Sequence, residues 1–271
     1  MEYAEKIIES ERFEKEPKRA SKRLWIAFKV ARTGNRVLEI LAALLILAML
    51  LYGGYSLWDT YQIYHNAFSD QELMEYKPAG GEENSPTLQE LQKINPDVCA
   101  WLTVDDTNID YPVVQGETDM EYINKDVYGN FAYSGAIFLD SQNHPDFSDS
   151  YNLIYGHHMS NGAMFGDVAE FCSKKYFKDH KTGTLYLPDD SDRKITFFAC
   201  IKASASDSQI YSPYAQTPET MKIFLKYVKD KAVQYREIEV DEKDQIVGLS
   251  TCAEADSNGR ILLFGKLDDV D

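Results

Sequence analysis

The 271-residue sequence lacks the local signatures of several large protein classes. It has no closely spaced cysteine pairs of the zinc-binding type, no Walker loop, no glycine fingerprint for dinucleotides and no internal repeat. It also lacks an excess of positive charge, because 44 Asp and Glu outnumber 28 Lys and Arg and give a formal net charge of -16. Non-specific nucleic-acid binding requires a basic face, so we expect no nucleic-acid partner.

The charge is unevenly distributed along the chain. Residues 1–36 carry ten Lys and Arg against six Asp and Glu, whereas the chain from residue 59 onward carries 18 against 37. The segment Ile40–Trp58, which lies between these two parts, contains no charged residue. A basic front and an acidic body on either side of an apolar run suggest that the two parts lie in different compartments.

The apolar run is long enough to cross a membrane, since about 20 helical residues span the hydrocarbon core. Basic flanks stay in the cytoplasm, so we predict a single-pass protein of the cell membrane with its N-terminus inside. The predicted parts are a cytoplasmic basic tail (1–36), a transmembrane signal anchor (37–58), an extracellular stalk (59–86) and an extracellular globular domain (87–271). The alternative is a cleaved secretory signal, although no clear cleavage site follows the run.

The globular part has the pattern of a mainly β domain. Short apolar segments separated by polar turns predict about eight strands, which is typical of a barrel or a sandwich. The expected strands are Trp101–Val104, Ile109–Val114, Gly135–Leu139, Asn152–Tyr155, Gly183–Leu187, Lys194–Ala203, Gln245–Ser250 and Arg260–Leu267. The expected helices are Leu88–Ile94 with a capping box from Thr87 and Glu90, Met164–Tyr176, and Pro218–Tyr235.

The chain has four cysteines, and their spacing shows no disulfide framework. Cys200 lies in an apolar segment that reads as a buried strand, and Cys172 lies on an expected helix. Free buried cysteine is common, so we interpret Cys99, Cys172 and Cys200 as packing residues.

Cys252 is different, because two other residues supply what a reactive thiol needs. It ends the run Val247–Cys252, Arg260 follows eight positions later, and His157 lies far upstream directly after Gly156. Acyl transfer through a thiol requires a thiolate, a proton donor for the leaving amine and a positive group near the developing oxyanion. This set of residues predicts a thiol acyl-transfer site.

These motifs resemble those of the sortase family of cysteine transpeptidases. The resemblance depends on Leu249-Ser250-Thr251-Cys252 with Arg260 and on Gly156-His157, and it extends over about residues 88–267. Further segments that are similar to class B sortases are Val113–Gly116, Ser134–Asp140, Tyr155–Met159 and Phe264–Leu267. The resemblance implies a mainly β (α+β) fold, an eight-stranded sortase-type β-barrel with peripheral helices, preceded by one transmembrane helix.

The resemblance also implies an activity and its residues. Cys252 would attack the scissile carbonyl, His157 rather than His158 would act as acid and base, and Arg260 would hold the oxyanion. Ser250, Thr251 and Tyr211 would contact the substrate. The substrates would be secreted proteins with a C-terminal sorting signal, and the acceptor would be an amine of a peptidoglycan precursor or of a pilin in a Gram-positive organism. We expect no metal and no cofactor.

Two other readings remain open at this point. An L,D-transpeptidase also places His before Cys before Arg, but that family has a Ser-His-Gly-Cys string where this chain has Leu-Ser-Thr-Cys. A membrane-anchored barrel that only binds surface proteins would carry the same fold with a broken catalytic geometry.

Overall fold

The computed structural model describes residues 22–65, 67, 71–78, 87–189, 191–212, 217–252 and 258–269. The side chains of residues 22–24, 62–65, 71–72 and 252 lie outside this description. The chain divides into two compact units, Met1–Asp59 and Thr60–Asp271.

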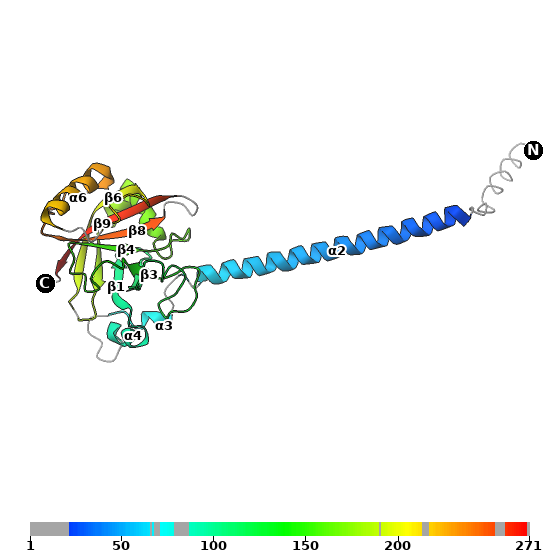
Figure 1. The fold of residues 1–271 in the computed structure, drawn as a ribbon, viewed down its shortest axis with the longest axis horizontal. Coiled ribbons are helices and arrows are strands. Elements are labelled where there is room, and N and C mark those ends of the chain that lie inside the picture. Colours follow the sequence, from blue (N-terminus) through cyan, green and yellow to red (C-terminus); the bar gives the residue numbers. More distant parts are fainter. Residues whose placement is uncertain are drawn as a thin grey trace, which may run out of the picture. The chain divides into compact units, whose positions relative to one another are not determined.

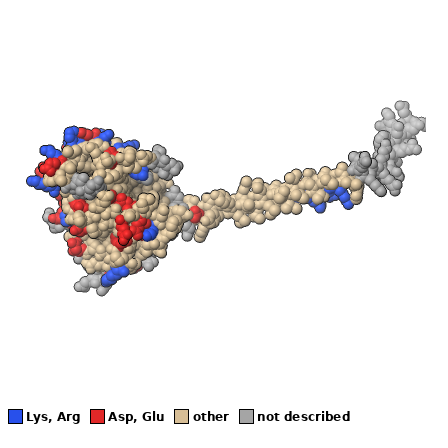
Figure 2. Space-filling view, viewed as in Figure 1, with Lys and Arg blue, Asp and Glu red and all other residues tan. Residues whose placement is uncertain are grey.

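The first unit contains most of one long helix, α2 (Lys22–His65), which continues beyond both ends of the segment 37–58 (Figure 1). No proline interrupts its 44 residues. Its stretch Trp25–Tyr61 is long and apolar enough to cross a membrane. On the face drawn in Figure 2, the helix has basic residues near its N-terminal end and is otherwise almost uncharged.

The second unit is built on nine strands within the described residues. They are β1 (Val98–Val104), β2 (Asp110–Val114), β3 (Ile137–Leu139), β4 (Tyr151–Tyr155), β5 (Thr182–Tyr186), β6 (Arg193–Ser204), β7 (Ala232–Tyr235), β8 (Gln245–Cys252) and β9 (Gly259–Asp269). Their order is β5-β1-β2-β3-β4-β8-β9-β6-β7, and β5 also pairs with β6. This extra pairing closes eight strands into a barrel and leaves β7 at the outside of β6. The predicted eight-stranded barrel is therefore confirmed.

Two pairs in this barrel, β2–β3 and β4–β8, are parallel, and the others are antiparallel. One hydrophobic cluster includes residues of all eight barrel strands, so it fills the barrel interior. Alternation along β8 places Val247 and Leu249 in this cluster and Ile246 in a second cluster on the outer face. The outer cluster is covered by Met221, Phe224 and Val228 of helix α6.

Helix α6 (Pro218–Lys231) is shorter than the expected helix over Pro218–Tyr235. Thr217 caps its N-terminus in a capping box with Thr220. Beyond Val228 the helical spacing of buried apolar residues ends, and residues 232–235 pair with β6 as strand β7 instead. The prediction of helix over these last four residues was wrong because pairing with a barrel strand overrides their local pattern.

The expected helix over Met164–Tyr176 is also divided. The structure has a 3₁₀-helix, η1 (Gly166–Cys172), and a separate helix α5 (Lys174–Asp179), with Ser173 extended between them. Val168 and Phe171 of η1 are both buried, and their spacing of three matches the 3₁₀ period.

Short helices that precede β1 in the chain cover part of the barrel. Helix α4 (Leu88–Ile94) occurs where it was predicted, but the Thr87 side chain makes no capping bond. Part of the predicted stalk packs on the barrel, since Ala67 and Leu73 near α3 (Gln71–Met74) are buried.

Candidate functional site

Three chain segments meet at one end of the barrel. In the antiparallel β8–β9 pair, Cys252 lies directly opposite Arg260. In the parallel β4–β8 pair, Tyr155 lies beside Ser250, and the Gly156 N–H then donates to the Ser250 carbonyl at 3.1 Å. The backbone therefore brings the histidine-bearing segment, the cysteine strand and the arginine strand together.

The register places the predicted nucleophile and the predicted cation on neighbouring strands. Cys252 is the last residue of β8, and its side chain and residues 253–257 lie outside the described part of the structure. Arg260 is half-buried at the start of β9, and its Nη1 donates to the Gly259 carbonyl at 2.9 Å.

His157 has a backbone partner that sets its tautomer. Its Nε2 lies 2.9 Å from the carbonyl oxygen of Ile123, in the long connection between β2 and β3. A carbonyl can only accept, so Nε2 carries the hydrogen in both the neutral and the charged imidazole. Nδ1 is consequently the ring nitrogen that this contact leaves available to another partner. By contrast, Nδ1 of His158 is buried and has no hydrogen-bond partner among the described residues.

Two glycines are required for this arrangement. A Cβ on Gly156 would lie 2.5 Å from Ile137 Cδ1 and 2.6 Å from the Phe165 ring, so only glycine fits before His157. Gly135 has a φ of +62°, and a Cβ there would lie 2.4 Å from the Ile123 carbonyl oxygen itself. Both glycines let the backbone approach closely where the histidine is held.

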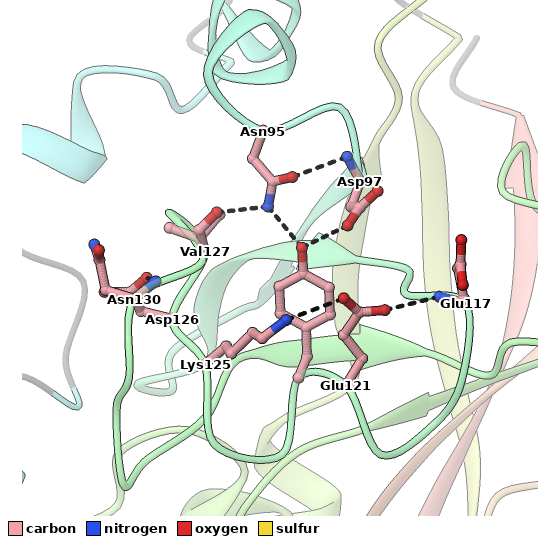
Figure 3. A network of polar contacts seen from close by, with 9 residues as sticks. Asn95, Asp97, Glu117, Glu121, Lys125, Asp126, Val127 and Asn130 are labelled. Carbon is pink, nitrogen blue, oxygen red and sulfur yellow. Dashed lines mark hydrogen bonds and ion pairs between the residues drawn. The ribbon is translucent and has the colours of Figure 1, made fainter.

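The connection that carries Ile123 is anchored by a buried polar network (Figure 3). The Tyr122 hydroxyl accepts from Asn95 Nδ2 at 2.9 Å and donates to Asp97 Oδ2 at 2.7 Å. Asn95 Nδ2 also donates to the Val127 carbonyl at 2.7 Å. Burial and the bond to Asp97 raise the pKa of Tyr122 to about 12, so its hydroxyl remains a donor at neutral pH.

Two of the three candidate substrate-binding residues, Tyr211 and Ser250, contact each other. The Tyr211 hydroxyl lies 3.0 Å from Ser250 Oγ, which ties the long segment after β6 to β8 beside the site. The Tyr211 ring stacks on Tyr155 at 6.2 Å between centroids. Thr251 is buried, and its hydroxyl has no hydrogen-bond partner within the described residues.

Tyr155 is connected to a carboxylate on the other side. Its hydroxyl donates to Asp140 Oδ2 at 2.8 Å. Burial and the nearby Asp140 charge raise the pKa of Tyr155, and burial also raises the pKa of Asp140. The stacked rings of Tyr155 and Tyr211 therefore border the ends of β4 and β8.

A family profile described as the sortase domain matches residues 102–268. The chain belongs to the sortase family. Sortase B of Listeria monocytogenes is 31% identical over 233 residues, which cover 83% of this chain and 94% of the relative. The match supports a class B type of sortase, and hence a cysteine transpeptidase.

Solved structures support the same class. A class B sortase of Streptococcus pyogenes involved in pilus biogenesis is 43% identical with a TM-score of 0.61, and the match covers 66% of this chain and 97% of that chain. Sortase B of Clostridium perfringens is 33% identical with a TM-score of 0.62, and the match covers 67% and 99%.

Sequence reasoning missed the parts of this sortase that orient the histidine. Ile123 acts through its backbone carbonyl, for which the sequence carries no signal. Tyr122 and Asn95 lie 27 positions apart, and only the fold shows that they touch. Tyr155 had a weak signal, because it directly precedes Gly156-His157.

We predict that Tyr122→Phe lowers the free energy of unfolding by about 1–3 kcal/mol, because Asp97 and Asn95 lose a buried partner. Denaturant unfolding followed by circular dichroism measures this. The matched control is Tyr133→Phe, an exposed tyrosine on the same connection, which should change stability by less than about 0.5 kcal/mol. Equal effects of the two substitutions would contradict the anchoring role of Tyr122.

Proposed function

We propose that this sortase is anchored in the cell membrane, cleaves a C-terminal sorting signal through a thioester on Cys252, and passes the acyl group to an amine. The observation that carries the proposal is the register of Cys252 opposite Arg260 at the barrel end where Gly156 binds β8. This register supports the proposal, because the backbones of the three residues named from the sequence meet at one barrel end, where their side chains would act on one peptide carbonyl.

The first half-reaction forms the thioester. The Cys252 thiolate attacks the scissile carbonyl, and His157 in its charged form donates the Nδ1 proton to the nitrogen of the leaving peptide. The C–N bond breaks and the acyl group remains on sulfur. In the second half-reaction an amine attacks the thioester, neutral His157 takes the amine proton at Nδ1, and Cys252 leaves as thiolate.

Arg260 stabilises the charge that develops on the carbonyl oxygen. A guanidinium offers a planar fork of donors, which suits an oxyanion. The bond from Nη1 to the Gly259 carbonyl supports this role, because it restrains the side chain near the β8–β9 pair. A positive group beside Cys252 would also favour its thiolate over the thiol.

Ser250, Thr251 and Tyr211 bind the sorting peptide in this proposal. The Tyr211–Ser250 contact supports it, because it places an aromatic ring and a hydroxyl within two residues of Cys252 in the strand. Tyr211 also comes from the segment between β6 and α6, so that segment borders the peptide path.

The proposed membrane anchor is argued from the helix of the first unit, and the proposed partners are argued from the similarity to known sortases. The exposed stretch of α2 from Trp25 to Tyr61, whose basic residues all precede the charge-free run Ile40–Trp58, supports a single span with the N-terminus in the cytoplasm and the barrel outside. The substrates are secreted proteins with a motif of the NPxTN or PxTG kind. The amine belongs to a cell-wall precursor or to a pilin. The sequence identity with a sortase involved in pilus biogenesis supports the pilin.

Cleavage of fluorogenic peptides that carry such motifs tests the nucleophile. We expect the full chain in detergent to cleave them and Cys252→Ala to show no cleavage above background, because the thiolate is removed. Cys99→Ala is the matched control, since its thiol is buried in the barrel core and should not be needed for turnover. Cleavage that persists in Cys252→Ala would remove Cys252 from the reaction.

Arg260→Lys tests the arginine separately. Lysine keeps the charge and loses the fork, so we expect kcat/KM to fall about 10²–10³-fold while the melting temperature is unchanged. Arg193→Lys is the control, because Arg193 pairs with Asp269 at the opposite end of the same β6–β9 pair. Near-normal turnover of Arg260→Lys would show that this arginine is only structural.

A further inference from the structure

Two cysteines that the proposed reaction does not use lie next to each other. Cys172 ends η1 and Cys200 lies in the middle of β6, 28 positions later, yet their sulfurs are 3.6 Å apart. Cys172 is half-buried and Cys200 is fully buried. The sequence predicted only packing for both, because nothing in their spacing shows that they meet.

We propose that Cys172 and Cys200 are a redox-active pair that closes to a disulfide when the protein meets a low-molecular-weight disulfide. The bond would join the end of η1 to the barrel strand β6. This modification site is separate from the proposed sorting reaction, and its test does not depend on that reaction.

The backbone holds the two thiols near each other independently of their own contact. Gln234 of β7 lies opposite Cys200 in the β6–β7 pair. The Gln234 Nε2 also donates to the carbonyl oxygen of Cys172 at 2.9 Å. Gln234 therefore connects the two cysteines, because its backbone lies opposite Cys200 and its side chain binds the backbone of Cys172. A disulfide requires the sulfurs to approach from 3.6 Å to about 2.05 Å, and Cys172 lies at the junction between η1 and α5.

The chemistry of the pair is asymmetric. The hydrogen bond from the Cys200 thiol lowers the pKa of Cys172, and the charge of Lys202 acts in the same direction. The bond to Cys172 and burial raise the pKa of Cys200. Cys172 is thus both the less buried residue and the better thiolate of the pair, so it is the point of entry for an oxidant.

The exchange is balanced in two steps. The Cys172 thiolate attacks one sulfur of the oxidant RSSR, forms a mixed disulfide and releases RS⁻. The Cys200 thiol gives its proton to solvent and attacks the Cys172 sulfur, which forms the protein disulfide and releases a second RS⁻. Two protein thiols are oxidised, and one RSSR is reduced to two thiols.

Cys99 is an internal control for the reactivity of the Cys172–Cys200 pair. It is also free and buried, but its sulfur contacts the Val113 carbonyl at 3.5 Å rather than another thiol. Burial raises the pKa of Cys99, so it should be inert to the same oxidant.

The full chain in detergent is incubated with oxidised glutathione, free thiols are alkylated, and unreduced peptides are identified by mass spectrometry. We expect a cross-linked peptide containing Cys172 and Cys200, two hydrogens lighter than the sum of the free peptides. Cys99 should be recovered alkylated after denaturation. The cross-link should raise the melting temperature by about 5–10 °C over the reduced protein, because it closes a loop of almost thirty residues.

Two variants separate the roles of the cysteines. Cys200→Ser should leave Cys172 as a lasting mixed disulfide with glutathione, since no second thiol resolves it. Cys172→Ser, at the half-exposed position, should leave Cys200 unmodified. Both cysteines alkylated after oxidation of the wild type, a lasting glutathione adduct on wild-type Cys172, or a cross-link from Cys172 to another cysteine would each overturn the proposal.

Discussion

The site depends on the parallel pairing of β4 with β8. These strands are about a hundred residues apart in sequence, and their pairing continues past the strand end through the bond from Gly156 N–H to the Ser250 carbonyl. That bond fixes where the chain leaves β4, and so places His157 beside the end of the cysteine strand. The β8–β9 register then adds Arg260 opposite Cys252. Barrel closure, rather than local sequence, therefore assembles the three residues.

A second constraint acts on the histidine alone. The Ile123 carbonyl holds Nε2 and leaves Nδ1 available to another partner, and Gly135 allows the backbone to pass within contact of that carbonyl. The buried Tyr122 network fixes the connection that carries Ile123. In the proposed reaction, an imidazole that is already oriented would not have to be ordered again in each half-reaction, and such preorganisation lowers the activation free energy.

The sequence predicted the regular parts of this protein well. All eight barrel strands occur within a few residues of their expected places, because alternation and polar turns mark strands directly. The residue types of Cys252, His157 and Arg260 indicated a thiol acyl-transfer site, and the resemblance to a family gave each of them its expected role. Strand β7 and the division of η1 from α5 were not predictable, since pairing with β6 and core packing decide them. The Ile123 carbonyl and the Cys172–Cys200 contact were not predictable either, because backbone atoms and long-range contacts leave no local pattern.

The most direct test of the account is to trap the acyl-enzyme. Full-length protein is mixed with a sorting-motif peptide without an amine acceptor, quenched in acid and digested for mass spectrometry. We predict that the peptide containing Cys252 gains the mass of the acyl fragment, and that neutral hydroxylamine removes this mass, as expected for a thioester. Cleavage of the substrate without an adduct on Cys252, or with the adduct on Cys172, would contradict the account.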